Sequence, residues 1–187
     1  MSSLTVPTTT LSGTYAIDPS HSRIGFVARH AMVTKVRGSF NQFEGRGYFD
    51  AEDPGNSGLE LTIDAASIDT RNPARDAHLR GNDFFAMEQY PQITFASTAV
   101  EQVDAESYRV TGDLTMRGVT RPVTLDLEFT GTSVDPYGNQ RIGFEGKTTV
   151  NRKDWGINWN APLDAGGVLV GEKVTLEFEV SAIRTEA

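Results

Sequence analysis

Apolar and polar residues alternate along much of the chain with a period of two residues. Such alternation predicts antiparallel strands that bury one face and expose the other. The alternation is clearest in the segments 59–65, 123–129 and 174–180. It is less regular in the segments 23–28, 92–98, 107–116 and 141–150. The longer segment 37–53 contains glycines that predict a bend or bulge.

These segments give about eight strands, and turn-forming sequences separate them. The turns include DPGNSG at 53–58, MRGVTRP at 116–122 and DPYGNQ at 135–140. Short strands with regular turns are typical of an all-β sandwich or barrel. Because nearly every strand has one polar face, a single closed layer buries all the apolar faces and removes free edges. We therefore predict a single antiparallel eight-stranded β-barrel.

One segment, around residues 72–89, breaks the alternation and predicts a short helical insert. Asn72 can cap a helix that has Pro73 at its first position, and Gly81 can end it. A second short helical piece is predicted to follow from residue 82 or 83 and to stop before Pro91.

Composition and charge narrow the class of protein. The chain has 187 residues, no cysteine and a net charge of −8. An acidic protein is a poor partner for duplex nucleic acid, and its net charge argues against loose electrostatic attachment to anionic membranes. No apolar run is long enough for a signal peptide or a membrane span. We expect a soluble cytoplasmic protein with a polar arm at 1–12 and one barrel domain at 13–187.

The sequence offers no recognisable catalytic or metal-binding motif. Metal sites need three or four closely placed ligands, and the spacing of His21, His30 and His78 fits no such pattern. Nucleophile elbows and phosphate-binding glycine motifs are also missing. We interpret the histidines as strand-end and loop residues, and we expect neither an enzyme nor a bound metal or cofactor.

The helical insert carries positive and aromatic residues that are predicted to lie close together. Residues 75, 78 and 79 share one helical face because they are three and four positions apart. One interpretation is a cap that binds the polar or anionic head of an amphiphile at the barrel mouth. The other is a plug that only covers the end of the barrel. The residues concerned are Arg75, His78, Leu79, Arg80, Phe84 and Phe85.

The inward strand faces combine large and small side chains. Small residues beside Phe95, Leu114 and Phe144 would leave room for an apolar chain, although glycine at a barrel bend gives the same pattern. In 107–116, the even-numbered residues should point inward, with Gly112 as a gap in their apolar row. The segment 151–167, with Trp155 and Trp159, is either a rim that orients a ligand or packing for the barrel end. The small residues are Ala28, Ser97, Gly112, Gly146 and Thr148.

Taken in order, the segments resemble the YceI-like family of polyisoprenoid-binding proteins. The resemblance starts in YAIDPSHSRIGFVARH at 15–30 and continues in VRGSFNQFEGRGYFD at 36–50. It runs on through 67–98, 108–129, 143–159 and 170–180, so it covers nearly the whole chain. The family implies a lipocalin-like barrel with a long apolar tunnel that holds a polyisoprenoid chain.

The resemblance also implies site residues and a function. We interpret Asp18, His21, Arg29 and His30 as a structural, non-catalytic motif at the barrel end that can contact the ligand's head, and Phe26 joins the predicted ligand-binding residues. The expected function is to bind, sequester or carry an isoprenoid lipid such as a quinone tail or a prenyl phosphate. The alternatives are an enzyme that uses the same pocket, with or without a metal, and a stress-response barrel that acts through a protein partner. A homodimer is compatible with the sequence.

Overall fold

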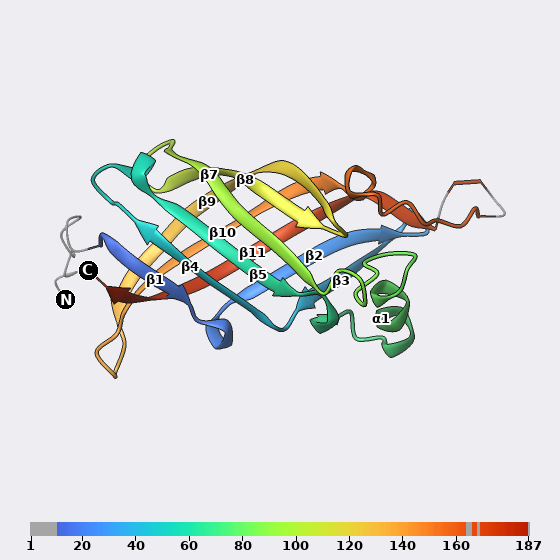
Figure 1. Cartoon of the computed structure of the whole chain (residues 1–187), viewed down its shortest axis with the longest axis horizontal. Coiled ribbons are helices and arrows are strands. Elements are labelled where there is room, and N and C mark those ends of the chain that lie inside the picture. The colour runs from blue at the N-terminus through green and yellow to red at the C-terminus, as the bar shows by residue number, and fades with distance from the viewer. Residues whose placement is uncertain (1–10, 164–165, 168, 187) are drawn as a thin grey trace.

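Antiparallel strands close into an eight-membered ring in the computed structural model of the chain, which describes residues 11–163, 166–167 and 169–186 (Figure 1). Closure satisfies the backbone groups that an open sheet would leave unpaired at its two edges. In spatial order the ring contains β1 (Gly13–Ile17), β4 (Phe43–Phe49), β5 (Gly58–Asp64), β7 (Gln92–Gln102), β8 (Ser107–Met116), β9 (Val119–Val134), β10 (Gln140–Asn151) and β11 (Val170–Glu186), which pairs again with β1.

Three further strands extend the wall at one end. β2 (Arg23–His30) pairs with the first part of β11, β3 (Thr34–Phe40) pairs with β2, and β6 (Ile68–Asp69) pairs with the end of β3. β1 and β2 are separated by a corner that contains the short 3-10 helix η2 (Pro19–His21). Because β11 pairs with both, β1 and β2 act as the two halves of one interrupted strand.

The all-β barrel predicted from the alternation is confirmed, and one segment differs in detail. Residues 37–53, expected to be one bent stretch, form the end of β3 and all of β4, with a break at Asn41 and Gln42. Three more 3-10 helices join the strands: η3 (Pro54–Asn56), η4 (Ala65–Ser67) and η5 (Arg152–Trp155).

The insert contains one helix, α1 (Pro73–Arg80), and it begins and ends where the sequence predicts. The Asn72 side chain accepts a hydrogen bond from the Arg75 backbone N–H at 3.1 Å, and Gly81 follows the last turn. The second helical piece was predicted wrongly, because residues after 81 form a series of turns. Ala86 has a φ of 47°, in the left-handed region, so a regular helix cannot continue through it.

Most of the predicted N-terminal arm, residues 1–10, lies outside the described residues. Its last two residues already bond to the barrel. The Tyr15 hydroxyl donates to the Leu11 carbonyl at 2.7 Å, and the Ala51 N–H donates to the Ser12 hydroxyl oxygen at 3.0 Å.

The inward faces of the strands form the apolar core. On β8, Tyr108, Val110, Leu114 and Met116 are all buried, as the alternation predicted. A smaller cluster around Tyr15, Ile142 and Ala182 lies at the end of the barrel that holds the two termini. A barrel core of this kind surrounds an axis that stays open unless side chains fill it.

Candidate functional site

The barrel encloses an apolar cavity of about 290 Å³. Its wall includes residues from all eight strands of the ring and from β2 and β3. Four residues of β11 that line it, Val174, Leu176, Phe178 and Val180, pack against the core and yet keep part of their surface accessible. Inward-facing apolar side chains that stay partly accessible indicate that the protein's own atoms do not fill the interior.

One end of the cavity is closed by the insert and by the loop that follows η5. Leu79, Phe84, Phe85 and Ile157 contribute to the wall there. The Arg117 guanidinium donates to the Phe84 carbonyl at 2.8 Å and so ties the turns of the insert to the β8–β9 hairpin. This end is therefore covered by apolar side chains that are held in place from several elements.

Aromatic rings narrow the opposite end of the cavity, near the termini. Phe49, Tyr108 and Phe144 all line the cavity, and their ring centroids are 5.7 to 6.0 Å apart in near-perpendicular pairs. Edge-to-face packing of this kind is favourable and rigid. The burial of Tyr108 raises the pKa of its hydroxyl, so that group is neutral at ordinary pH. The cavity therefore runs from an apolar plug to an aromatic end, whose wall also includes Tyr48 and Ser57.

The predicted ligand-binding residues divide into two groups. Arg29 and His30 end β2 at an exposed hairpin and lie outside the cavity wall. The predicted residues that do line the cavity are Phe26, Leu79, Phe84, Phe85, Phe95, Leu114 and Phe144.

The positive residues of the insert hold the insert in place and do not face the cavity. Arg75 donates to the side chain and to the carbonyl of Thr70, at 2.7 Å each. Arg80 donates to the carbonyls of Ala66 and Ile68 at 2.9 and 3.2 Å. Of the two interpretations of the insert, this geometry supports the plug.

His78 and the two tryptophans also pack the closed end. The His78 ring makes perpendicular contacts with Phe84 and Trp159, at centroid distances of 5.0 and 4.7 Å, and its Nε2 lies 2.9 Å from the Asp83 carboxylate. Trp155 is buried, and its indole N–H donates to the Leu114 carbonyl at 2.9 Å. Both tryptophans therefore fasten the end of the barrel, and neither lines the cavity.

The expected gap at Gly112 is closed. An added Cβ there would lie 2.5 Å from the Phe95 ring and 2.6 Å from the Ala96 carbonyl oxygen. The Phe95 ring itself lines the cavity and occupies the room above the glycine. Among the small residues, Ala28 contributes to the wall, and the ones that do not are Ser97, Gly112, Gly146 and Thr148.

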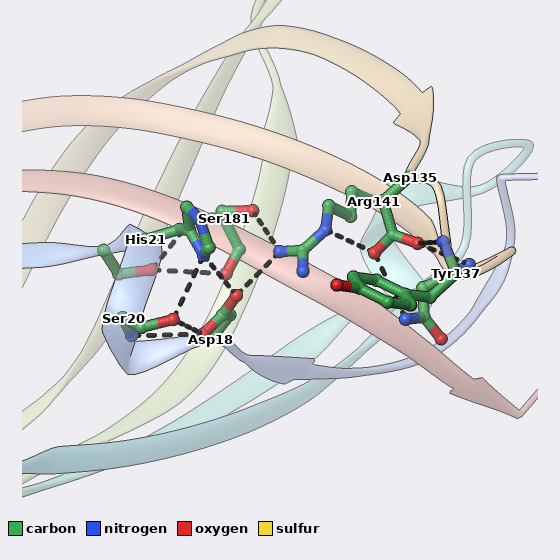
Figure 2. Close-up of polar contacts among 9 residues, drawn as sticks. Asp18, Ser20, His21, Asp135, Tyr137, Arg141 and Ser181 are labelled. Atoms are coloured by element: carbon green, nitrogen blue, oxygen red, sulfur yellow. Dashed lines mark hydrogen bonds and ion pairs between the residues drawn. The ribbon is translucent and has the colours of Figure 1, made fainter.

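A polar network joins the β1–β2 corner to the β9–β10 hairpin outside the cavity (Figure 2). Arg141 donates to Asp18 at 2.8 Å and to Asp135 at 2.9 Å. The Nδ1 atom of His21 lies 2.8 Å from Asp18 and 3.1 Å from the Ser20 hydroxyl. A catalytic triad uses one imidazole nitrogen for the serine and the other for the carboxylate. Here both partners meet the same nitrogen, so the arrangement is structural.

The same network lowers the pKa values of its two carboxylates. Hydrogen bonds from Arg141 and Ser20 hold the pKa of Asp18 well below its usual range, against a smaller opposing effect of burial. Burial raises the pKa of Asp135, but hydrogen bonds from Asn139 and Arg141 outweigh it and lower that pKa to about 2. Both groups are therefore anions that stabilise this corner at neutral pH.

Arg152 lines the cavity and was missed by the sequence analysis. Its side chain is buried, and burial lowers the pKa of the guanidinium while Glu172 partly opposes the shift. It donates to the carbonyls of Ile157, Val170 and Gly171 at 2.7 to 3.2 Å. In the sequence it stands beside exposed Lys153, and nothing local distinguishes the buried cation from the exposed one.

Within the described parts of the chain, no three His, Cys, Asp or Glu side chains come together in a way that could hold a metal ion. No described helix combines the length and the apolar character needed to cross a membrane.

Comparisons with known proteins agree with this architecture. A family model described as YceI-like domain matches residues 15–182. The UPF0312 protein SAS2572 of Staphylococcus aureus is 40% identical over 169 residues, which are 90% of this chain and 95% of that protein.

Solved structures are similar over most of their length. BcnA of Burkholderia cenocepacia has a TM-score of 0.78 and 25% identity, with 88% of this chain and 98% of that one covered. The YCEI protein of Campylobacter jejuni has a TM-score of 0.72 and 30% identity, with 84% and 90% covered. A domain from Saccharophagus degradans, described as polyisoprenoid binding and implicated in plant cell wall breakdown, shares the fold with a TM-score of 0.67 and 16% identity over 91% and 98%.

Proposed function

The chain belongs to the YceI-like domain family, and from this membership and its cavity we propose that it binds a polyisoprenoid lipid inside the barrel. The observation that carries the proposal is the wall of the cavity, which is built almost entirely from hydrocarbon side chains. A dry apolar cavity of this kind favours an apolar occupant over water. The related domain described as polyisoprenoid binding adds support.

Burial of the lipid tail supplies the driving force. An isoprene unit has five carbons, and each buried carbon contributes roughly 0.8 kcal/mol before the cost of ordering the chain. An engineered cavity of about 150 Å³ holds benzene. By that measure the 290 Å³ cavity accommodates about ten to twelve carbons, or about two isoprene units, without rearrangement. A longer tail must displace side chains or extend beyond the barrel.

The scarcity of polar groups in the wall bears on the head group. Two arginines line the cavity: Arg152 is buried and already donates to three carbonyls, and Arg46 is exposed to solvent. The side chains of Arg75, His78 and Arg80 are used elsewhere in the insert. We therefore propose that the protein recognises the tail, and that quinones and prenyl phosphates with the same tail bind with similar affinity.

Native mass spectrometry of gently purified protein tests the proposal. We expect excess mass that organic extraction removes, and we expect the extracted protein to take up an added prenyl alcohol. Protein that is consistently bare and refuses prenyl alcohols, quinones and phosphates alike would contradict lipid binding. That result would favour a barrel that acts through a protein partner. Conversion of the added lipid into a product would instead favour an enzyme.

A further inference from the structure

The hairpin between β2 and β3 exposes two large apolar side chains at its tip. Met32 and Val33 retain 64% and 76% of their accessible surface, and they follow one another in the three-residue turn from Ala31 to Val33. Single exposed apolar residues are common on protein surfaces. Two adjacent ones on one turn form a small apolar tip, of which Met32 lies beside Gly167 and Val33 is the more exposed.

Turn formation does not explain the residues at this tip. Ala31 and Met32 have φ values of 50° and 63°, a left-handed conformation for which glycine and asparagine are the usual choices. The turn is held by a hydrogen bond from the Ala31 N–H to the Leu169 carbonyl at 2.7 Å and by one from Arg29 to the Val33 carbonyl at 3.1 Å. Met32 therefore occupies a backbone conformation in which glycine or asparagine would be less strained.

The two strands behind the tip carry like charges on their outer face. Arg29 and Lys35 are exposed and lie directly opposite each other in the strand register, an arrangement that destabilises a sheet. Among the described residues, neither of them forms an ion pair, whereas Arg37 lies 4.0 Å from Glu177. The whole segment 23–43 has four Lys and Arg residues and no Asp or Glu, in a chain with 25 acidic and 17 basic residues.

The hairpin lies at the end of the barrel that also carries α1, opposite the two termini (Figure 1). The inner face of its first strand contributes Phe26 and Ala28 to the cavity wall. The basic outer face and the apolar tip therefore belong to the same strand that bounds the cavity. His30, the last residue of β2, is only two positions beyond Ala28, or roughly 7 Å along an extended strand.

We propose that this hairpin docks the barrel on the surface of an anionic lipid bilayer. Met32 and Val33 enter the headgroup region, and Arg29 and Lys35 lie against the lipid phosphates. Shallow apolar insertion beside cations is the usual way in which a protein segment binds such a surface. A second copy of the chain fits less well, because a symmetric contact through this hairpin would bring its positive charges together. Duplex nucleic acid offers no place for the apolar tip.

The charge on the rest of the molecule determines which end of the barrel faces the membrane. The net charge of −8 repels an anionic membrane over most of the surface. On the hairpin, Glu177 of the neighbouring β11 pairs with Arg23 and Arg37, and Arg29 and Lys35 next to the tip remain available to attract it. The barrel therefore meets the membrane with its cavity end first, where an apolar ligand could pass between bilayer and cavity. This purpose rests on the proposed lipid binding, but docking itself does not, and the two are measured separately.

Vesicle flotation of the full chain tests docking without any prenyl ligand. We expect the protein to bind vesicles of equimolar phosphatidylcholine and phosphatidylglycerol at low salt, and not vesicles of phosphatidylcholine alone. Arg29→Gln with Lys35→Gln should weaken binding to the mixed vesicles by roughly 25-fold, since each of the two cations contributes about 1 kcal/mol and 1.4 kcal/mol is a factor of ten. Added salt should weaken binding of the wild type in the same way.

Two further variants separate the tip from general stickiness. Met32→Asn with Val33→Thr removes the apolar tip and keeps a residue that tolerates positive φ, so it should fold normally and lose vesicle binding. Val134→Thr with Tyr137→Asn changes two residues of the β9–β10 hairpin, near the termini, that are on average even more exposed than the tip residues, and this variant should bind like the wild type.

Three outcomes would overturn the proposal. The first is that the wild type binds both kinds of vesicle equally. The second is that the tip and charge variants fold and still bind like the wild type. The third is that the control variant loses as much binding as the tip variant. Light scattering adds a fourth: a dimer that the tip variant dissociates would assign the hairpin to a contact between copies. The prenyl alcohol uptake of the tip variant should be unchanged, so a failure of docking and a failure of lipid binding are distinguishable.

Discussion

Filling the cavity from one wall should separate ligand binding from fold stability. Ala28 is a small residue of the cavity wall, and in the strand register it lies between Val174 of β11 and Val36 of β3. In Ala28→Phe, the added ring has as many carbons as benzene, for which an apolar cavity of about 150 Å³ is sufficient. The ring therefore takes up roughly half of the 290 Å³ cavity.

This substitution should weaken ligand binding without lowering the free energy of unfolding. Displacing about six ligand carbons at ~0.8 kcal/mol each removes up to ~5 kcal/mol of gross burial from the bound lipid. Ordering costs lower the net loss, so we expect the Kd for a prenyl alcohol to rise by tenfold or more. Inserting a ring into a filled core would destabilise the protein by about 1–3 kcal/mol. In an open cavity, the ring buries its own surface and the free energy of unfolding should be unchanged or higher.

Chemical denaturation of extracted protein and titration with a prenyl alcohol measure both quantities. Val27→Phe is the matched control, because it adds a ring one residue earlier on the opposite face of β2 and should leave the Kd unchanged. The reasoning is refuted if Ala28→Phe binds the lipid with the wild-type Kd. A loss of more than about 1 kcal/mol of stability would also refute it, because that is the response of a filled core.

Three other predictions follow from the geometry. The Kd for prenyl alcohols should fall steeply up to about ten to twelve carbons and then level off, since the 290 Å³ cavity holds about that number. A titration series in which every further isoprene unit lowers the Kd by the same factor would contradict the cavity volume. Gly112→Ala should lower the free energy of unfolding by about 1–3 kcal/mol, because its Cβ would lie 2.5 Å from a ring carbon, whereas Gly55→Ala, with its nearest atom at 3.4 Å, should be nearly neutral; equal stability of the two variants would contradict this. Finally, the wild type should lose stability as the pH falls from about 4 towards 2, because carboxylates with lowered pKa values stabilise fully above their unfolded pKa of about 3.9 and progressively less below it. Arg141→Gln removes the partner shared by Asp18 and Asp135, so its melting curves should show a smaller loss over the same range. An unchanged pH dependence would count against the network.

Local patterns in the sequence predicted the strands and the one helix well. Alternation with a period of two residues identifies the buried face of β8, because each inward residue there is apolar and each outward residue is polar. The helix was predicted from Asn72, Pro73 and Gly81, whose effects act within one turn. The piece after Gly81 was predicted wrongly because its N–H groups donate back to the end of α1, as from Phe85 to Leu79, and because Ala86 has a positive φ.

The site was predicted less well, because spacing does not tell which way a face points. Arg75 and Arg80 share the insert as expected, but they turn to carbonyls between β5 and α1 and away from the cavity. Gly112 lies in the inward row, yet the room above it depends on Phe95 of the neighbouring strand, and strand register decides that. The net charge of −8 likewise did not reveal the locally basic β2–β3 hairpin, because it averages over the whole chain.

The position of β11 in the ring has a consequence for how the chain folds during synthesis. β11 pairs with β10 on one side and with β1 and β2 on the other, yet it follows all of them in the sequence. The ribosome therefore releases every other strand before the one that closes the ring, while edges and apolar inner faces are still unprotected. Contacts such as Ala16 with Ile183 join distant parts of the chain, and distant pairings form slowly. The newly made chain consequently keeps an open, aggregation-prone sheet until β11 is in place.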